Sequence, residues 1–141
     1  MSKKIKWHIH FKTSPQKVYH YLATQEGRER FWAKAAPQVD GYIHFVFAND
    51  QVYKSEVLTS IPCSSFKIEY FDSVVTFILK EDGHGGTDLT VFNTDVPEKE
   101  YAESYPGWVS WLMTLKAAVD FQVDLRNHDS TRTWDQGYVD N

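Results

Sequence analysis

The chain has 141 residues, of which 42% are hydrophobic and 16% are aromatic. This length and composition fit one domain with a single core and exclude a chain that is disordered throughout. The net charge of −4 at pH 7 argues against non-specific nucleic-acid binding as the main activity. The single cysteine, Cys63, excludes an internal disulfide and is typical of a reducing compartment.

The chain opens with polar residues, and no apolar run near Met1 is long enough for a signal peptide or a spanning helix. We therefore expect a cytoplasmic protein with no membrane insertion. Residues 4–11 then alternate between apolar and polar side chains, which predicts a half-buried β-strand. Ser14 and Pro15 supply an N-cap and a first-turn proline for a helix ending near Thr24, and Thr24 can cap a second helical turn over 25–32.

The middle of the chain reads as a series of strands joined by short turns. The predicted strands are Tyr42–Phe47, Gln51–Ile61, Phe66–Phe71, Ser73–Lys80 and Thr87–Asn93. The glycine-rich segment 82–86 offers the positive-φ positions that a hairpin turn needs. Short links between successive strands predict an antiparallel meander.

A long C-terminal helix is predicted from Ser104 to Leu125, with Pro106 in its first turn. Its apolar residues recur at steps of three and four and form one face: Trp108, Trp111, Leu112, Leu115, Val119 and Val123. Its other side is expected to carry Ser110, Thr114, Lys116, Asp120 and Asp124, with Met113 and Phe121 exposed among them. Those two apolar residues mark either an interface or a surface that the tail covers through Trp134 or Tyr138. A long amphipathic helix across one face of an antiparallel sheet gives an α+β domain.

Four segments, taken in order, resemble a known family. They are Ser14–Tyr19 with Leu22, Phe31-Trp32, Glu81–Thr90, and Gly107–Leu112 with Leu115-Lys116. Together they resemble the START-like (SRPBCC, helix-grip) superfamily and, within it, the activator-of-heat-shock-ATPase (Aha-type) homologue branch, which often has a Trp pair where this chain has Phe31-Trp32. The resemblance implies a single START-like domain over residues 1–125, followed by a polar C-terminal tail over residues 126–141.

The fold implied by the resemblance is a curved antiparallel sheet of about six strands that grips the long helix, with two short helices after the first strand and a hydrophobic cavity between sheet and helix. Members bind lipids, sterols, polyketides or other apolar ligands, some are cyclases or hydrolases, and others are co-chaperone domains. The cavity-lining residues expected here are Trp32, Phe45, Phe47, Tyr53, Phe66, Tyr70, Phe77, Asn93, Trp108, Trp111, Leu112, Leu115 and Gln122. The polar members, Tyr53, Tyr70, Asn93 and Gln122, are candidates to orient a ligand. The alternative is that the aromatic residues form an ordinary packed core.

Other candidate chemistry is weaker. His8 and His10 share one strand face and only His44 offers a third metal ligand, so solvent-facing histidines are the preferred interpretation and no metal or cofactor is predicted. Cys63 has no basic neighbour to activate its thiol, and no catalytic residue is predicted.

The function that the sequence favours is non-covalent binding of a small hydrophobic or aromatic molecule, lipid-like or polyketide-like. The alternative is a protein-interaction domain of the co-chaperone type, which stimulates a heat-shock chaperone ATPase or self-associates through the long helix. A cyclase- or hydrolase-like enzyme would need an ionisable residue inside the cavity, and the sequence places none there.

Overall fold

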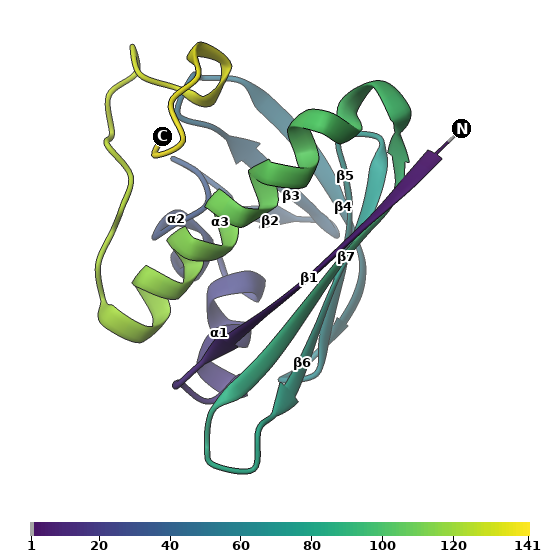
Figure 1. Ribbon diagram of the computed structural model, residues 1–141, viewed down its shortest axis with the longest axis vertical. Coiled ribbons are helices and arrows are strands. Elements are labelled where there is room, and N and C mark those ends of the chain that lie inside the picture. The colour runs from purple at the N-terminus through teal and green to yellow at the C-terminus, as the bar shows by residue number, and fades with distance from the viewer. Residues whose placement is uncertain (1) are drawn as a thin grey trace.

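The computed structural model describes residues 2–141, which form one antiparallel sheet around a long helix (Figure 1). The sheet has seven strands in the order β1-β7-β6-β5-β4-β3-β2. Their bounds are β1 (Ser2–Phe11), β2 (Gln38–Val39), β3 (Tyr42–Val46), β4 (Val52–Ile61), β5 (Ser65–Tyr70), β6 (Ser73–Glu81) and β7 (Thr87–Pro97). The helices are α1 (Pro15–Ala23), α2 (Gln25–Glu29) and α3 (Tyr101–Phe121), with single 3-10 turns η1 (Glu98–Glu100) and η2 (Trp134–Gln136).

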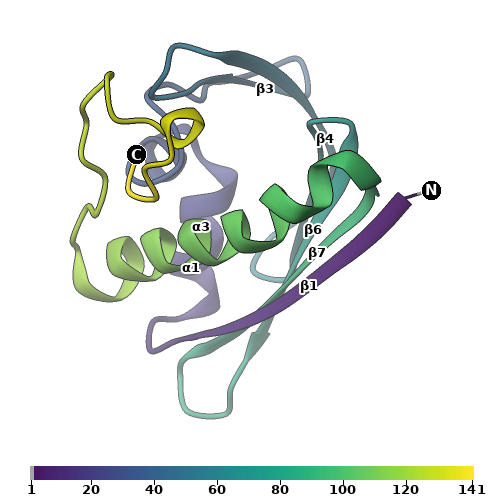
Figure 2. The ribbon, with the colours of Figure 1, turned by 45° about the horizontal axis from the view of Figure 1, so that its top comes forward.

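The predicted α+β helix-grip arrangement is confirmed. Figure 2 shows the sheet curving around α3, while the C-terminal tail turns back toward the end of β3, where Asp135 accepts from the Asn49 amide at 3.2 Å. The predicted meander is present as β3 to β7, and β1 closes the sheet by pairing antiparallel with β7. The two-residue strand β2 is an addition, since a segment so short has no alternation to detect.

The start of the chain follows its local signals. In β1 the alternation places Ile5 and Phe11 in the core, at 1% and 0% exposed. Ser14 caps α1 by accepting from the Lys17 amide, and Thr24 caps α2 by accepting from the Gly27 amide at 3.0 Å. The two short helices thus begin where the capping residues predicted them.

Helix α3 begins earlier than predicted, at Tyr101, so Pro106 is its sixth residue and not part of its first turn. The added turn contacts β1, where the Lys3 ammonium lies 5.6 Å from the centre of the Tyr101 ring. Just after the turn, the Trp7 ring lies 4.9 Å from the Tyr105 ring, and Trp7 Nε1 donates to the Tyr105 carbonyl at 3.2 Å. The residues in these contacts are 98 positions apart in the chain, so no local sequence pattern predicts this start of the helix.

Helix α3 also ends earlier than predicted, at Phe121. Gln122 adopts a left-handed conformation at φ 57°, and its amide and that of Val123 donate back to the Ala118 and Ala117 carbonyls. Val123 therefore lies beyond the helix and is 47% exposed, where the helical spacing had placed it on the buried face. The usual signal for such an end is a glycine, which this chain lacks at position 122.

Asp120 is buried, although its position in the helix pattern predicted a solvent-facing side chain. Its carboxylate accepts from the Lys12 amide at 3.1 Å, the Thr13 hydroxyl at 2.8 Å and the Lys116 ammonium at 3.0 Å. Burial alone would raise the pKa of Asp120, but the hydrogen bonds from Thr13 and Lys12 and the Lys116 charge outweigh it and lower the pKa. The carboxylate ties the last turn of α3 to the loop between β1 and α1.

The C-terminal tail returns along α3. Arg126 anchors its start by donating to the Glu29 and Ala33 carbonyls at 3.0 and 3.2 Å. Further along, Trp134 Nε1 donates to Glu103 at 2.7 Å, and the Ser110 hydroxyl donates to the carbonyl of Val139 at 2.5 Å. The tail leaves Met113 and Phe121 uncovered, at 51% and 57% exposed, so it does not cover those two residues as one interpretation of the sequence had it. Within residues 2–141 no helix is long and apolar enough to cross a membrane.

Candidate ligand-binding site

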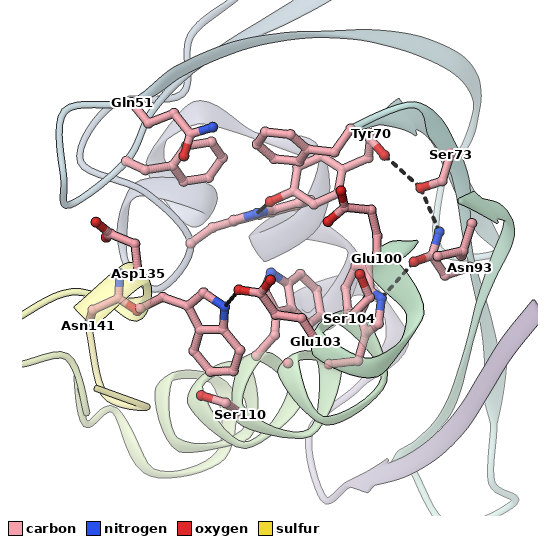
Figure 3. A pocket seen from close by; sticks show the side chains of 18 of the residues that line it. Gln51, Tyr70, Ser73, Asn93, Glu100, Glu103, Ser104, Ser110, Asp135 and Asn141 are labelled. Carbon is pink, nitrogen blue, oxygen red and sulfur yellow. Dashed lines mark hydrogen bonds between the residues drawn. The ribbon is translucent and has the colours of Figure 1, made fainter. Parts of the chain in front are cut away.

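A pocket of about 600 Å³ lies beside the N-terminal half of α3 (Figure 3). One side is formed by the turn between β3 and β4 and by the turn between β5 and β6, and another by the end of β7 and η1. The tail completes it, since Trp134, Asp135 and Val139 are among the lining residues. The curvature of the sheet keeps its outer strands away from α3 and so leaves this space open at one end of the helix.

The floor of the pocket is aromatic. Trp111 is one of its lining residues, with ring centroids 5.0 Å from Trp32 and 5.1 Å from Trp108, both in steep edge-to-face arrangements. Tyr70 faces Trp32 at 5.8 Å and Trp108 at 6.2 Å. Edge-to-face packing of this kind fixes ring orientations and leaves apolar surface for a planar or hydrocarbon guest.

A hydrogen-bond chain holds the inner end of the pocket. Trp108 Nε1 donates to Asn93 Oδ1 at 2.9 Å, Asn93 Nδ2 donates to Ser73 Oγ at 2.8 Å, and Ser73 Oγ donates to the Tyr70 carbonyl at 2.6 Å (Figure 3). Asn93 Nδ2 also donates to the carbonyl of Val74, so both its amide hydrogens are used. Asn93 therefore positions Trp108, and its amide N–H groups are not free for a ligand.

Tyr70 and Trp32 form a second polar contact in the floor. Trp32 Nε1 donates to the Tyr70 hydroxyl at 3.1 Å. Burial raises the pKa of Tyr70 above its usual value, and the Trp32 hydrogen bond only partly opposes this. Tyr70 is therefore a neutral phenol at physiological pH.

One polar atom in the floor has no partner. Trp111 Nε1 is buried and donates to no acceptor among residues 2–141, whereas the indole N–H groups of Trp32, Trp108 and Trp134 are all bonded. A buried donor without an acceptor costs about 1–3 kcal/mol relative to a bonded one. The nitrogen has less than 1 Å² of accessible surface, so other atoms of the Trp111 ring line the pocket and the N–H does not open into it.

The turn between β5 and β6 brings two further residues to the pocket. Phe71 and Asp72 have φ values of 48° and 61°, a left-handed conformation that is unusual for a bulky aromatic residue. The Phe71 ring stacks on Tyr53 at 4.2 Å and lies 4.7 Å from the Tyr70 ring. These contacts hold Phe71 as a wall of the pocket, at a backbone cost of about 1–2 kcal/mol.

Of the residues that the sequence singled out, six line this pocket: Trp32, Phe47, Tyr70, Asn93, Trp108 and Trp111. Five others are buried behind it in the core: Phe45, Phe66, Phe77, Leu112 and Leu115. Tyr53 stacks on Phe71, outside the lining of the pocket, and donates to Glu69. Burial is the larger cause and this hydrogen bond the smaller one that raise the pKa of Tyr53 to about 12. Gln122 lies outside the pocket and is exposed at the end of α3, where it lines a smaller hollow. Its Nε2 donates to the carbonyl of Val119 at 3.2 Å.

Sequence reasoning missed the pocket residues of the tail and of the helix start. Trp134 was recognised only as a residue able to dock. The signal for its docking site is Gly107, where a Cβ would lie 3.5 Å from the Trp134 ring. Glu100 and Glu103 were assigned to no site because the predicted helix began only at Ser104.

The two histidines considered as metal ligands have other partners. His8 Nδ1 lies 2.9 Å from the Thr90 hydroxyl, and His10 Nε2 lies 2.7 Å from Asp82. The hydrogen bond from His10, together with those from backbone amides, lowers the pKa of Asp82 to about 2. Both histidines therefore take part in contacts on the sheet surface, away from the pocket.

The fold and the pocket can be compared with known proteins. The family model for Activator of Hsp90 ATPase homolog 1-like protein matches residues 12–120. No curated protein matches the chain. The solution structure of the Aha1 dimer from Colwellia psychrerythraea is similar, with 22% identity, 84% of this chain and 97% of that chain covered, and a TM-score of 0.75.

Two further solved structures share the fold. The AHSA1-like protein from Rhizobium etli is 18% identical, with 86% of this chain and 84% of that chain covered and a TM-score of 0.68. DynU16, from the dynemicin biosynthetic locus, is 15% identical, with 84% of this chain and 48% of that chain covered and a TM-score of 0.73. At these identities the similarity concerns the fold, whereas the family model matches most of the chain. The chain therefore belongs to the Activator of Hsp90 ATPase homolog 1-like family.

Proposed function

We propose that this protein binds a small apolar or aromatic molecule non-covalently in the pocket beside α3. The observation that carries the proposal is an aromatic-lined pocket of about 600 Å³. Pockets for small molecules have volumes of about 300–1,000 Å³ and combine apolar walls with a few polar groups. The floor of Trp32, Trp108 and Trp111 supplies the apolar walls, and burial of apolar ligand surface against it gains about 25 cal/mol per Å².

DynU16, which shares the fold, comes from a biosynthetic locus for a small molecule, which agrees with a ligand-binding use of the fold.

The direct test is native mass spectrometry of the protein purified from its own cells, followed by organic extraction and analysis of what is released. We expect a reproducible adduct of small-molecule mass. A clean apo mass that stays clean after exposure to a panel of lipids and aromatic metabolites would contradict the proposal.

A pair of variants on α3 locates the binding site. Trp111→Ala is expected to lower ligand affinity at least tenfold, because it removes one of the three indole rings of the floor. Met113→Ala is the matched control, since Met113 lies on the same helix, is 51% exposed and does not line the pocket. If Trp111→Ala simply unfolds the protein, as circular dichroism would show, Trp111 acts as a core residue, and unchanged affinity in a folded Trp111→Ala variant would contradict binding at this site.

A second candidate function is protein interaction of the co-chaperone type, and the outward face of α3 is the observation that favours it. Val109, Met113 and Phe121 are 43%, 51% and 57% exposed at helical spacing, and together they leave apolar surface uncovered. The family is named for activation of a chaperone ATPase. A pull-down with the middle domain of the ninety-kilodalton heat-shock chaperone and an ATPase assay test this function, with Met113→Glu expected to abolish any binding seen. If the protein neither binds the chaperone nor stimulates its ATPase, the co-chaperone function is excluded.

A further inference from the structure

The part of the tail that completes the pocket is bonded mainly to itself. Residues 127–140, the tail loop, are closed at their base by Asn127, whose amide N–H donates to the Asp140 carbonyl at 2.7 Å and whose Nδ2 donates to Asp140 Oδ1 at 3.1 Å. Inside the loop, the Tyr138 amide donates to the Thr133 carbonyl at 3.2 Å and so closes the η2 turn. A compact loop whose ends lie together in this way keeps its shape through its own contacts.

The bonds between the tail loop and the rest of the domain are few. Three hydrogen bonds, all at the surface, join it to residues 2–121: Trp134 Nε1 to Glu103, the Ser110 hydroxyl to the carbonyl of Val139, and the Asn49 amide to Asp135. No ion pair among residues 2–141 joins the loop to the sheet or to α3. Exposed hydrogen bonds contribute little net stability because water can replace either partner, so the loop can separate from the domain at low cost.

The chain just before the tail loop is fixed by contrast. The Arg126 guanidinium, with its side chain only 10% exposed, donates to the Glu29 and Ala33 carbonyls and binds Asp124 at 2.9 Å. His128 Nε2 lies 2.7 Å from the same Asp124 carboxylate, so this contact also stays at the base of the loop. A movement of the loop must therefore turn about the backbone that follows Arg126.

The tail loop forms one side of the pocket. Trp134, Asp135 and Val139 line it, and Figure 3 shows Asp135 on the side of the pocket opposite Ser73. The loop spans from the turn between β3 and β4 to α3, because its three bonds go to those two places. The Trp134 ring rests on α3 at Gly107, where no side chain separates the two.

We propose that the tail loop is a lid. It swings as one body about the backbone that follows Arg126, and a guest enters or leaves the pocket while its three bonds to the domain are broken. This inference rests on the proposed ligand-binding function for its purpose, whereas the movement itself needs no guest. The two can therefore be tested separately.

Hydrogen exchange measured by NMR on the full chain without a guest tests the movement. Opening of a rigid lid breaks the bond from Trp134 Nε1 to Glu103 and leaves the Asn127 and Tyr138 amides bonded inside the loop. We expect the Trp134 indole N–H to be protected about tenfold less, or lower still, than these two amides. Equal protection of all three would overturn the lid, since the loop would then unravel instead of moving as one body. Protection of the Trp134 indole equal to that of the buried Trp108 indole would also overturn it.

The rates of guest exchange test the purpose of the movement. The probe is N-phenyl-1-naphthylamine, an uncharged fluorescent aromatic molecule, mixed with the protein in a stopped-flow instrument. Ser110→Ala removes one bond of the lid, and Trp134→Phe removes another while keeping a ring against Gly107. Each should raise both the association and the dissociation rate constant about fivefold, because the bond must break for entry and for exit alike.

Two further chains sharpen this measurement. In the double variant Ser110→Ala, Trp134→Phe the increases should multiply to about twenty-five-fold, since one movement breaks both bonds. The matched control is Ser130→Ala, because Ser130 is exposed in the tail loop and does not line the pocket. It should leave both rate constants unchanged.

The outcomes separate the lid from the binding function. Probe binding with unchanged rate constants in both single variants would overturn the lid and leave the proposed function intact, because the guest would then enter by another route. An increase in the dissociation rate constant alone would also overturn the lid, since it indicates a lost contact with the probe. Absence of probe binding to the parent protein would count against the proposed function, and hydrogen exchange would then decide the lid movement by itself.

Discussion

Two neighbouring tryptophans of α3 should respond in different ways to the same substitution. Trp108 Nε1 donates to Asn93 Oδ1 at 2.9 Å, and Trp111 Nε1 has no partner among residues 2–141. The rings lie 5.1 Å apart on the same face of one helix, so helix propensity and general burial differ little between them. Replacing each with phenylalanine therefore isolates the value of the indole N–H.

The expected free energies follow from these contacts. Truncation of a buried tryptophan to phenylalanine removes apolar contacts worth about 1–2 kcal/mol at either site. Trp108→Phe in addition leaves Asn93 Oδ1 buried without a donor, which costs about 1–3 kcal/mol more. Trp111→Phe removes an unsatisfied donor, which returns about 1–3 kcal/mol and cancels most of the truncation. We expect Trp108→Phe to destabilise by about 3 kcal/mol and Trp111→Phe to change stability by less than about 1 kcal/mol.

The measurement is equilibrium unfolding in urea with ligand-free protein, because a bound ligand would add its own free energy to the folded state. Equal slopes of unfolding free energy against urea for the variants and the parent would show that both variants unfold from the same compact state. A loss for Trp111→Phe as large as that for Trp108→Phe would refute the reasoning, since it would mean that Trp111 Nε1 is satisfied in solution.

Three further substitutions test the packing described above. Asp120→Asn should lower the free energy of unfolding at pH 7 by about 2 kcal/mol, because the Lys116 ammonium loses its charged partner. Because folding lowers the pKa of Asp120, the stabilisation by its carboxylate is present above the unfolded pKa of about 3.9 and is lost as pH falls through the folded pKa. The difference in unfolding free energy between parent and variant should therefore narrow at acidic pH. A difference that stays constant down to strongly acidic pH would contradict this. Gly27→Ala should destabilise by several kcal/mol in thermal unfolding, because its Cβ would come within 2.4 Å of the backbone of α1. Gly107→Ala should instead stabilise α3 by about 0.5–1 kcal/mol, since its Cβ would make an ordinary contact with the Trp134 ring; a lower melting temperature would show that the tail packs more tightly than the structure indicates.

The sheet and the short helices were predictable because their signals are local. The alternation in β1 and the caps Ser14 and Thr24 each act within a few residues, and the structure follows them. The ends of α3 were not predictable in this way. The first residue, Tyr101, contacts Lys3 of β1 from the other end of the chain, and the left-handed Gln122 ends the helix without a glycine.

The pocket was predictable in its floor and not in its walls. Trp108 and Trp111 follow from helical spacing, because a face that carries two tryptophans must lie against something apolar. The walls depend on long-range returns of the chain, in which Trp134 reaches Glu103 and Asp135 reaches Asn49. Neither contact leaves a periodic pattern in the sequence, so polar residues that line the pocket looked like ordinary surface residues.

The position of the tail has a consequence for how this fold diversifies. The family model ends at residue 120, yet Trp134, Asp135 and Val139 from beyond that boundary line the pocket. The shared scaffold and one wall of the pocket are thus encoded in separate stretches of sequence. Substitutions at Trp134, Asp135 or Val139 can therefore alter the shape of the pocket without changing any residue of the sheet or of α3.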